Sequence, residues 1–443
     1  MSNTSALSTS QTIHLLQPVH ARRKLSISGL SLNGLLLFAA SFLVVGSGFQ
    51  SMRPEIMGLL LHPYLIPVAL AFPFVVMMRF GAFPGRIAAA LVCFIAIYYF
   101  SILAGGGIVL GEVFKMASSG LTIVTCALLV RRRGDFVAGS LGLGIAVAIL
   151  AVRGLQGESD GGGSALDAAN RNAYSLFALP PILLGGFICL RMPTVSMVVK
   201  GILVACTLAA LATIFMSANR SGYLGSALIA LMLFWNRRGR GLLLVGFVAG
   251  TLVLWISQFG DTKVFDERIR QTMEGNASDD YRLEIIRTCI EIGLSNPVIG
   301  VSPQNLPLEL GRRNQVGHGV GYINSHNIFG HILAGSGIFC FLALAAVAAS
   351  MWFWKPRNGI AICGKDDPLY EARSLMRMII VLWAVRGVFT NDILYNPSFN
   401  IGIGLCIGLC ILSETAREAV LTAGAERALA TARPPNTIPR TAS

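Results

Sequence analysis

The segment 325–350, SHNIFGHILAGSGIFCFLALAAVAAS, marks the point where the longest polar stretch of this chain ends and apolar sequence resumes. It opens with Ser325-His326-Asn327 and continues without a charged residue for about 20 positions, the length that a helix needs to cross a bilayer. Upstream, residues 260–325 are rich in charged and polar side chains. The chain therefore consists of a polar loop, 260–325, between two groups of apolar spans, 30–259 and 326–413.

Composition indicates a protein with many membrane-spanning helices. Hydrophobic residues make up 54% of the 443 residues and charged residues only 13%, with a mean hydropathy of +0.66. A soluble domain carries about 25% charged residues. Apolar windows of about 20 residues recur, and the alternating pattern of a membrane β-barrel is absent. We therefore expect an all-α polytopic membrane protein.

The apolar windows predict about 12 transmembrane helices. Residues 1–29 form a polar N-terminal tail, and residues 414–443 form a tail that we expect to be disordered after a short amphipathic start. The expected spans are 30–49, 57–78, 84–104, 108–130, 135–152, 172–190, 197–216, 221–235, 241–259, 326–350, 374–394 and 397–413.

Basic residues gather in every second loop between these spans. Cytoplasmic loops of membrane proteins carry an excess of Lys and Arg. This rule places both termini in the cytoplasm and makes 260–325 a large periplasmic loop, with a second outer loop at 153–171. The net charge of +13 then reflects topology, and no nucleic-acid partner is expected. The clusters are Arg22-Arg23-Lys24, Arg79 with Arg86, Arg131-Arg132-Arg133, Arg191 with Lys200, Arg237-Arg238-Arg240, and Lys355, Arg357, Lys365 and Arg373.

Arg220 lies on the expected outer side, in the segment 217–222, SANRSG, which opens a span. Asn219 or Ser221 is available as the helix N-cap. A helix N-terminus offers free N–H groups and partial positive charge, and an arginine adds a planar cationic fork, so the combination favours phosphate binding. The alternative is an interfacial arginine without a ligand.

Arg282 lies in the polar loop, in a segment with helical spacing. Residues 280–293 read as an amphipathic helix that Asp279 or Asp280 caps and Asn296-Pro297 follows. The alternative is a surface helix whose Arg and Glu residues pair at i,i+3 and i,i+4. By spacing alone, this alternative is favoured.

His326 stands where the polar loop re-enters apolar sequence, and an imidazole acts as a base near neutral pH. The alternative is a capping histidine. His318 and His331 lie nearby, but the five-residue spacing between His326 and His331 suits one helix face poorly and no carboxylate completes a ligand set. We expect no metal site. Nucleotide-binding motifs and a nucleophile elbow are absent, so no cofactor is expected.

Four further charged residues lie near the outer ends of spans. Glu112 and Lys115 are three residues apart and are expected to pair. Arg386 and Asp392 lie near the outer end of the eleventh span and could line the same cavity. Burying a charged group within a membrane is costly, so charged residues found there often have a function. For these four residues, anchoring at the membrane interface is an equally good explanation.

Taken in order, these motifs resemble the O-antigen ligase and Wzy-type polysaccharide polymerase superfamily of bacterial inner membranes. The resemblance covers about residues 200–345. It rests on SANRSG (217–222), Tyr281-Arg282-Leu283-Glu284-Ile285, NPVIGVSPQN (296–305), Ser325-His326-Asn327 and Gly335-Ser336-Gly337-Ile338. One departure is Ile286, where members often have an aromatic residue after the loop arginine.

The resemblance implies a membrane glycosyltransferase fold of the C type and an active site facing the periplasm. Such proteins move a glycan from undecaprenyl pyrophosphate to an acceptor sugar by a metal-independent, inverting transfer. It implies that Arg220 and Arg282 bind pyrophosphate and that His326 acts on the acceptor hydroxyl. The secondary candidates are Arg287, Arg312, Arg313, Asn327 and Arg386.

Two functions compete within the resemblance, and a third lies outside it. An O-antigen ligase uses lipid A-core as acceptor, and a Wzy-type polymerase uses a second lipid-linked repeat unit. We favour the ligase type, because one dominant outer loop ends in Ser-His-Asn. A transporter or flippase places charges near the bilayer midplane beside broken helices in related halves. Here the charges gather at the expected outer surface, which favours the transferase.

Overall fold

A computed structural model describes residues 31–48, 55–56, 59–60, 62–106, 110–155, 168–216, 220–234, 277–314, 323–356 and 367–432. These residues are almost entirely helical. Two-residue strands β1 (Glu55–Ile56) and β2 (Leu59–Leu60) form a small antiparallel pair in which Glu55 faces Leu60.

Long helices dominate the described part of the chain. Eight of them are long and apolar enough to cross a membrane, so the prediction of an all-α polytopic membrane protein is confirmed. The helices are α2 (Leu32–Phe42) with the 3-10 turn η2 (Leu43–Gly48), α3 (Leu65–Arg79) with η4 (Phe80–Ala82), α4 (Gly85–Ala104), α5 (Leu110–Leu129), α6 (Arg133–Leu155), α7 (Ala168–Arg191), α8 (Met197–Met216), α9 (Arg220–Phe234), α12 (Ala277–Ser295), α13 (Leu306–Arg313), α14 (Ile328–Trp352), α15 (Pro368–Gly387), η5 (Asp392–Tyr395) and α16 (Pro397–Ala432).

The expected spans differ from these helices in three places, and the ninth, 241–259, lies outside the described residues. The second span begins at Leu65 because residues 55–60 form the β1–β2 pair. The eleventh begins at Pro368, where Asp367 Oδ1 accepts the Leu369 N–H at 2.9 Å and caps the helix. The last helix continues to Ala432, because alanine and other strong helix formers fill 414–432.

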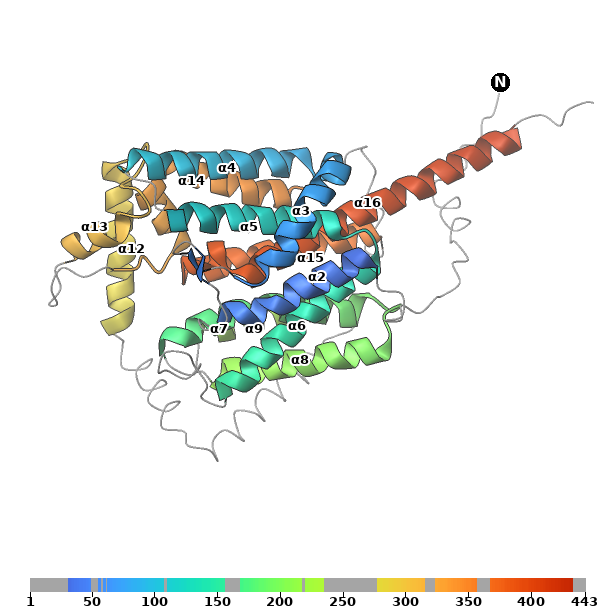
Figure 1. The fold of residues 1–443 in the computed structure, drawn as a ribbon, viewed down its shortest axis with the longest axis horizontal. Coiled ribbons are helices and arrows are strands. Elements are labelled where there is room, and N and C mark those ends of the chain that lie inside the picture. The colour runs from blue at the N-terminus through green and yellow to red at the C-terminus, as the bar shows by residue number, and fades with distance from the viewer. Residues whose placement is uncertain are drawn as a thin grey trace, which may run out of the picture.

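Helix α16 is the central element of the bundle, and the other helices surround it (Figure 1). In its apolar window 83% of the residues are buried, against 28% in α3 and α4. Helices α5, α6, α7 and α15 pack against it. Its last turns project beyond the other helices at one end of the bundle (Figure 1).

Glycines bring α16 and α5 into close contact. A Cβ atom at Gly404 would lie 2.7 Å from the Ile123 carbonyl oxygen, and one at Gly408 would lie 2.7 Å from that of Ala127. This four-residue spacing of small residues is a common helix-packing device in membranes, where no hydrophobic driving force joins helices. The backbones of α5 and α16 therefore approach to a distance that only glycine permits.

Helix α12 lies across one end of the bundle, with α13 beside it (Figure 1). We call this the α12 end. A small apolar core joins α12 and α13 to α14 and is separate from the main core. It contains Ile285, Cys289, Ile292, Leu306, Leu310 and Ala334. The prediction of a helix over 280–293 is confirmed by α12, and α13 adds a second helix to the polar loop.

Helix α14 is interrupted at Gly337, which has φ 79° and ψ 179°. The loop that follows α12 fills the interruption. The Val301 N–H donates to the Ala334 carbonyl at 2.9 Å, and the Ile338 N–H donates to the Pro297 carbonyl at 2.7 Å. The loop thus satisfies backbone groups that the break would leave without partners at membrane depth.

Arg79 and Arg191, from two of the basic clusters expected in the cytoplasm, lie at the opposite end of the bundle, at the ends of α3 and α7 (Figure 1). Arg79 Nη1 donates to the Leu128 carbonyl at 3.2 Å, and Arg191 Nη1 lies 3.8 Å from Glu371 Oε1. This charge asymmetry agrees with the expected topology. Which end faces the periplasm stays a prediction.

Gly337→Ala is expected to destabilise the fold strongly. A Cβ atom there would lie 2.4 Å from the Val298 carbonyl oxygen, and the positive φ adds strain. We expect a loss of about 2 kcal/mol or more, seen as a lower midpoint in thermal unfolding of the purified protein. Gly201→Ala is the matched control, since nothing lies within 4 Å of the new atom. Equal midpoints for the two variants would contradict the account of the break.

Asp135→Ala is expected to loosen the contact between the start of α6 and the segment before α2. The buried Asp135 carboxylate accepts N–H groups from Arg131 at 3.0 Å and Arg132 at 2.8 Å, and the Ser31 hydroxyl donates to it. Hydrogen bonds to a charged group contribute about 1.5–3 kcal/mol each. Thermal unfolding should occur several degrees lower than in wild type. Arg132→Ala, which keeps its backbone N–H, should unfold like wild type.

Candidate functional site

The polar loop joins the bundle at Asn327, the N-cap of α14. Its side-chain oxygen accepts the Gly330 N–H at 2.8 Å, and its Nδ2 donates to the Val388 carbonyl at 3.0 Å. Both ends of the amide are therefore used to fix the start of α14 against the segment after α15. Asn327, a secondary site candidate, is placed as a positioning residue.

His326 precedes this cap and has a left-handed backbone, with φ 48°. A non-glycine residue seldom adopts this conformation, and such strain is frequent at functional sites. The His326 N–H donates to Asn324 Oδ1 at 3.3 Å. The imidazole of His326 is half-buried, and none of its described hydrogen bonds caps α14. Asn327 fills that role.

The surroundings of His326 lower the pKa of its imidazole below the usual 6.5. Burial is the largest cause, and the positive charge of Arg282 adds to it, while the carboxylate of Asp392 acts in the opposite direction. The neutral imidazole is therefore the main form at neutral pH. This form can accept a proton from a hydroxyl group.

Arg282 reaches His326 because α12 crosses the first turns of α14. A Cβ atom at Gly330 would lie 3.1 Å from that of Cys289, and one at Gly293 would lie 2.7 Å from Leu333 Cγ. Two turns before Cys289, the half-buried Arg282 lies within electrostatic range of the imidazole. The structure thus brings together two residues that are 44 positions apart.

Asp392 is the member of this group whose pairing with His326 was not predicted. It lies in η5, directly after α15, and is exposed. The sequence pattern placed it in one cavity with Arg386, because both lie near the outer end of the same expected span. The Asn327–Val388 hydrogen bond instead brings the segment after α15 to the start of α14. Nothing in the spacing of the sequence indicates that contact.

Glu112 forms a second polar group at the α12 end. Its Oε1 lies 2.8 Å from Lys115 Nζ, as expected from their spacing. Its other oxygen accepts the Tyr395 hydroxyl at 3.2 Å, and Tyr395 and Tyr98 share a hydrogen bond of 2.5 Å. Sequence analysis missed both tyrosines. The group ties α4 and α5 to η5.

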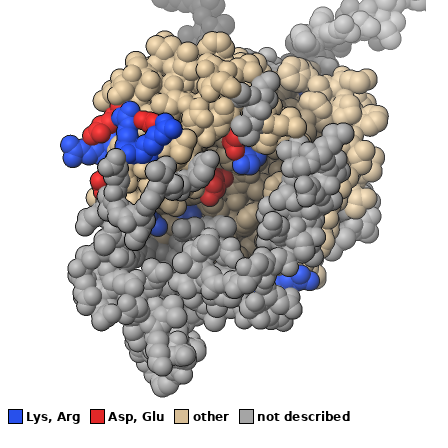
Figure 2. Space-filling view, turned by 60° about the vertical axis from the view of Figure 1, so that its left-hand side comes forward, with Lys and Arg blue, Asp and Glu red and all other residues tan. Residues whose placement is uncertain are grey.

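The loop arginines proposed as secondary candidates pair with glutamates of their own helices. Arg287 Nε lies 3.2 Å from Glu291 Oε1 on α12. On α13, Arg312 Nη1 and Arg313 Nε lie 3.8 and 2.8 Å from Glu309. Figure 2 shows basic and acidic side chains side by side on this face. Such exposed pairs contribute little to stability and form no strongly basic patch.

Arg220 is the first residue of α9, as predicted, so Ser221 lies within the helix and is not its N-cap. The Arg220 side chain lies outside the described part of the structure, and so do Asn219 and His318. The proximity of Arg220 to Arg282 stays a prediction. His331 is buried in α14, where its Nδ1 shares a hydrogen bond of 3.2 Å with Ser325 Oγ.

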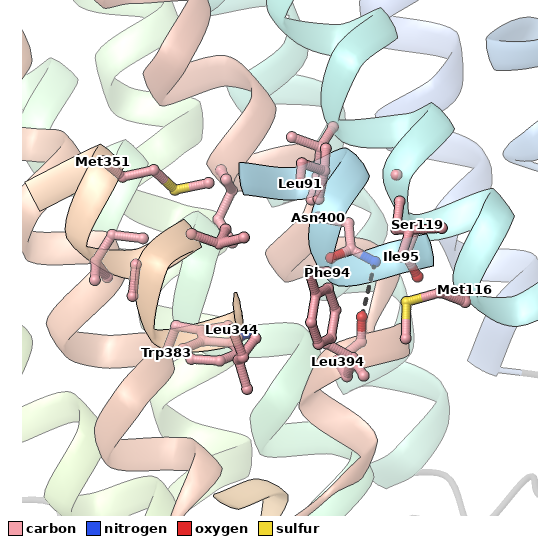
Figure 3. A pocket seen from close by; sticks show the side chains of 16 residues that line it. Leu91, Phe94, Ile95, Met116, Ser119, Leu344, Met351, Trp383, Leu394 and Asn400 are labelled. Carbon is pink, nitrogen blue, oxygen red and sulfur yellow. Dashed lines mark hydrogen bonds between the residues drawn. The ribbon is translucent and has the colours of Figure 1, made fainter. Parts of the chain in front are cut away.

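An apolar cavity of about 50 Å³ lies inside the bundle between α4, α5, α14, α15 and α16 (Figure 3). Leu91, Phe94, Leu344 and Trp383 line it, and the Asn400 amide at its edge is bonded to the Leu394 carbonyl at 3.4 Å. No acid, base or arginine is among its lining residues. It therefore suits hydrocarbon and cannot be the place of acid–base chemistry.

At the α12 end, a neutral imidazole thus lies within electrostatic range of a cation and a carboxylate. This arrangement can take a proton from a hydroxyl and stabilise negative charge on a leaving group. Both abilities are needed when a sugar is moved from a phosphate to a hydroxyl.

Comparison with known proteins agrees with this geometry. Residues 205–345 match the family described as O-antigen ligase, and no curated protein matches the chain. The match spans α9, α12, α13 and much of α14, and it includes Arg220, Arg282 and His326. It confirms the resemblance seen in the sequence and supports glycan transfer of the ligase or polymerase type. Over residues 205–345, the chain is therefore similar to the O-antigen ligase family.

Proposed function

We propose that this protein is an inner-membrane glycosyltransferase of the O-antigen ligase type. It moves a glycan from undecaprenyl pyrophosphate to a sugar of lipid A-core on the periplasmic face. The observation that carries the proposal is the half-buried His326, held in a strained backbone beside Arg282 within the matched family domain. The runner-up is a Wzy-type polymerase, which would use a second lipid-linked repeat unit as acceptor.

His326 acts on the acceptor. Its neutral imidazole takes the proton of the acceptor hydroxyl as the oxygen attacks the anomeric carbon of the donor sugar. The bond from that carbon to the pyrophosphate oxygen breaks on the opposite side, so the configuration inverts. The electron pair leaves with the pyrophosphate.

The arginines act on the donor. Pyrophosphate is a good leaving group, which needs stabilisation of its charge more than a proton. Arg282 supplies a fixed positive charge near His326, and the N-terminus of α9 with Arg220 supplies a second. Because arginine charge replaces that of a metal ion in this scheme, transfer by the purified enzyme should be insensitive to EDTA.

The sidedness of the reaction rests on the charge distribution. Among the described basic residues, Arg79 and Arg191 lie at the end of the bundle opposite α12, and basic clusters favour the cytoplasm. The site at the α12 end would then face the periplasm, where lipid-linked glycans are available and nucleotide sugars are not.

His326→Ala is expected to abolish transfer in cells that depend on this protein, because it removes the proposed base. On a polysaccharide gel, loss of a ligase gives lipopolysaccharide without long chains, together with accumulated lipid-linked polymer. Loss of a polymerase gives single repeat units. His62→Ala removes an imidazole bonded to Ser47 and serves as control. An unchanged gel profile for His326→Ala would refute the mechanism.

The pH dependence of transfer should follow the pKa of His326. Activity requires the neutral imidazole and is lost as pH falls through that pKa. Because burial and Arg282 lower the pKa, the acidic midpoint of kcat/KM should lie below 6.5. Asp392→Asn removes the charge that raises the pKa, so the midpoint should move to still lower pH. A shift to higher pH in this variant would contradict the assignment.

A further inference from the structure

Arg386 is a buried cation that the proposed mechanism does not use. It lies in the last turn of α15, and only 1% of its surface is exposed. Its Nη2 donates to Ser175 Oγ at 2.9 Å. Its Nε and Nη1 have no hydrogen-bond partner, and no ion pair involves it, among the described residues. A buried charge without a counter-ion is costly in a membrane protein and points to a function.

Arg377, nine residues before Arg386 on α15, shows how such a side chain is usually accommodated. Arg377 Nε donates to the Trp352 carbonyl at 3.1 Å, and its guanidinium lies 5.3 Å from the Trp352 ring centre. Arg377 is also partly exposed. Arg386 has neither solvent nor an aromatic ring, and its one partner is a neutral hydroxyl. Its charge therefore remains uncompensated within the described structure.

Arg386 lies just below the start of α14. A Cβ atom at Gly387 would lie 2.5 Å from Ile328 Cγ2, so the last turn of α15 contacts the first residue of α14. The Asn327 hydrogen bond to Val388 joins the two segments above this contact. His326 thus precedes the residues that contact Gly387 and Val388, which directly follow Arg386.

The partner of Arg386, Ser175, lies level with the first turn of α9. Helices α7 and α9 run in the same direction, and a Cβ atom at Gly225 would lie 2.5 Å from Leu179 Cδ1. Four residues earlier on each helix, Ser175 and Ser221 are at the same height. The guanidinium of Arg386 therefore lies near the depth at which α9 begins.

We infer that Arg386 forms the floor of an anion site, where it binds a phosphate group of the lipid-linked substrate from within the bundle. Arg282 contacts that group from the loop side. The unpartnered donors of Arg386 and its uncompensated charge are the features that an anionic oxygen would satisfy. This inference rests on the proposed function, since it assigns a role within the same site.

Binding measurements test the inference without activity. Full-length protein in nanodiscs is titrated with farnesyl pyrophosphate and, separately, with inorganic pyrophosphate, in an isothermal calorimeter. Arg386→Gln should weaken farnesyl pyrophosphate binding about tenfold or more, because it removes a charge-assisted hydrogen bond. Arg377→Gln is the matched control and should bind like wild type. If Arg386→Gln weakens the binding of both probes, Arg386 recognises the phosphate groups. If it weakens the binding of neither probe, the inference is refuted.

A second variant separates a binding role from a structural one. In Arg386→Met an apolar chain of similar length replaces the uncompensated charge, so the ligand-free protein should unfold at the wild-type temperature or above. The rise in unfolding temperature on adding farnesyl pyrophosphate should disappear. A lower unfolding temperature with an unchanged ligand-induced rise would show that Arg386 is structural and would overturn the inference.

A wrong role for Arg386 can be distinguished from a wrong proposed function by comparing two variants. His326→Ala should bind farnesyl pyrophosphate like wild type while losing glycan transfer. If His326→Ala loses transfer but Arg386→Gln binds normally, only the role of Arg386 is wrong. If Arg386→Gln loses binding but His326→Ala still transfers, the anion site stands and the proposed catalytic role of His326 is wrong.

Discussion

The insertion of the loop after α12 into the break of α14 holds the α12 end together. Backbone groups at membrane depth must find partners within the protein, and the break at Gly337 would leave several without one. Val301 and Ile338 form the two hydrogen bonds that repair it. Because the same loop begins at the end of α12, the repair also fixes α12 across α14. The distance between Arg282 and His326 depends on this fit.

The site combines partly or fully buried charged side chains with a strained backbone. His326 has a left-handed backbone, and its imidazole is kept neutral by burial and by the cation of Arg282. Below it, Arg386 is buried with a serine as its described partner. Residues in such positions lower stability and persist where the surrounding packing holds them. Here the cap at Asn327 and the contact of Gly387 with Ile328 provide that packing.

Sequence patterns predicted the helices where composition alone decides them. Most spans matched because a membrane requires about 20 apolar residues, whatever their neighbours. The errors arose where a local feature overrides hydropathy. The hairpin at 55–60 delays α3, the cap at Asp367 starts α15 early, and the alanine-rich tail keeps α16 helical to Ala432. The amphipathic helix over 280–293 was identified, although spacing could not say what it crosses.

The sequence by itself determined the class of protein, the alternation of basic loops and the order of the motifs that match the O-antigen ligase family over residues 205–345. These follow from hydropathy and charge, which act at each position independently of the fold. Only the tertiary structure decided which charged groups meet. Asp392 lies near His326 and Arg386 bonds to Ser175, 211 residues away. Such contacts depend on how helices cross and on close approach at glycines, and no local pattern encodes them.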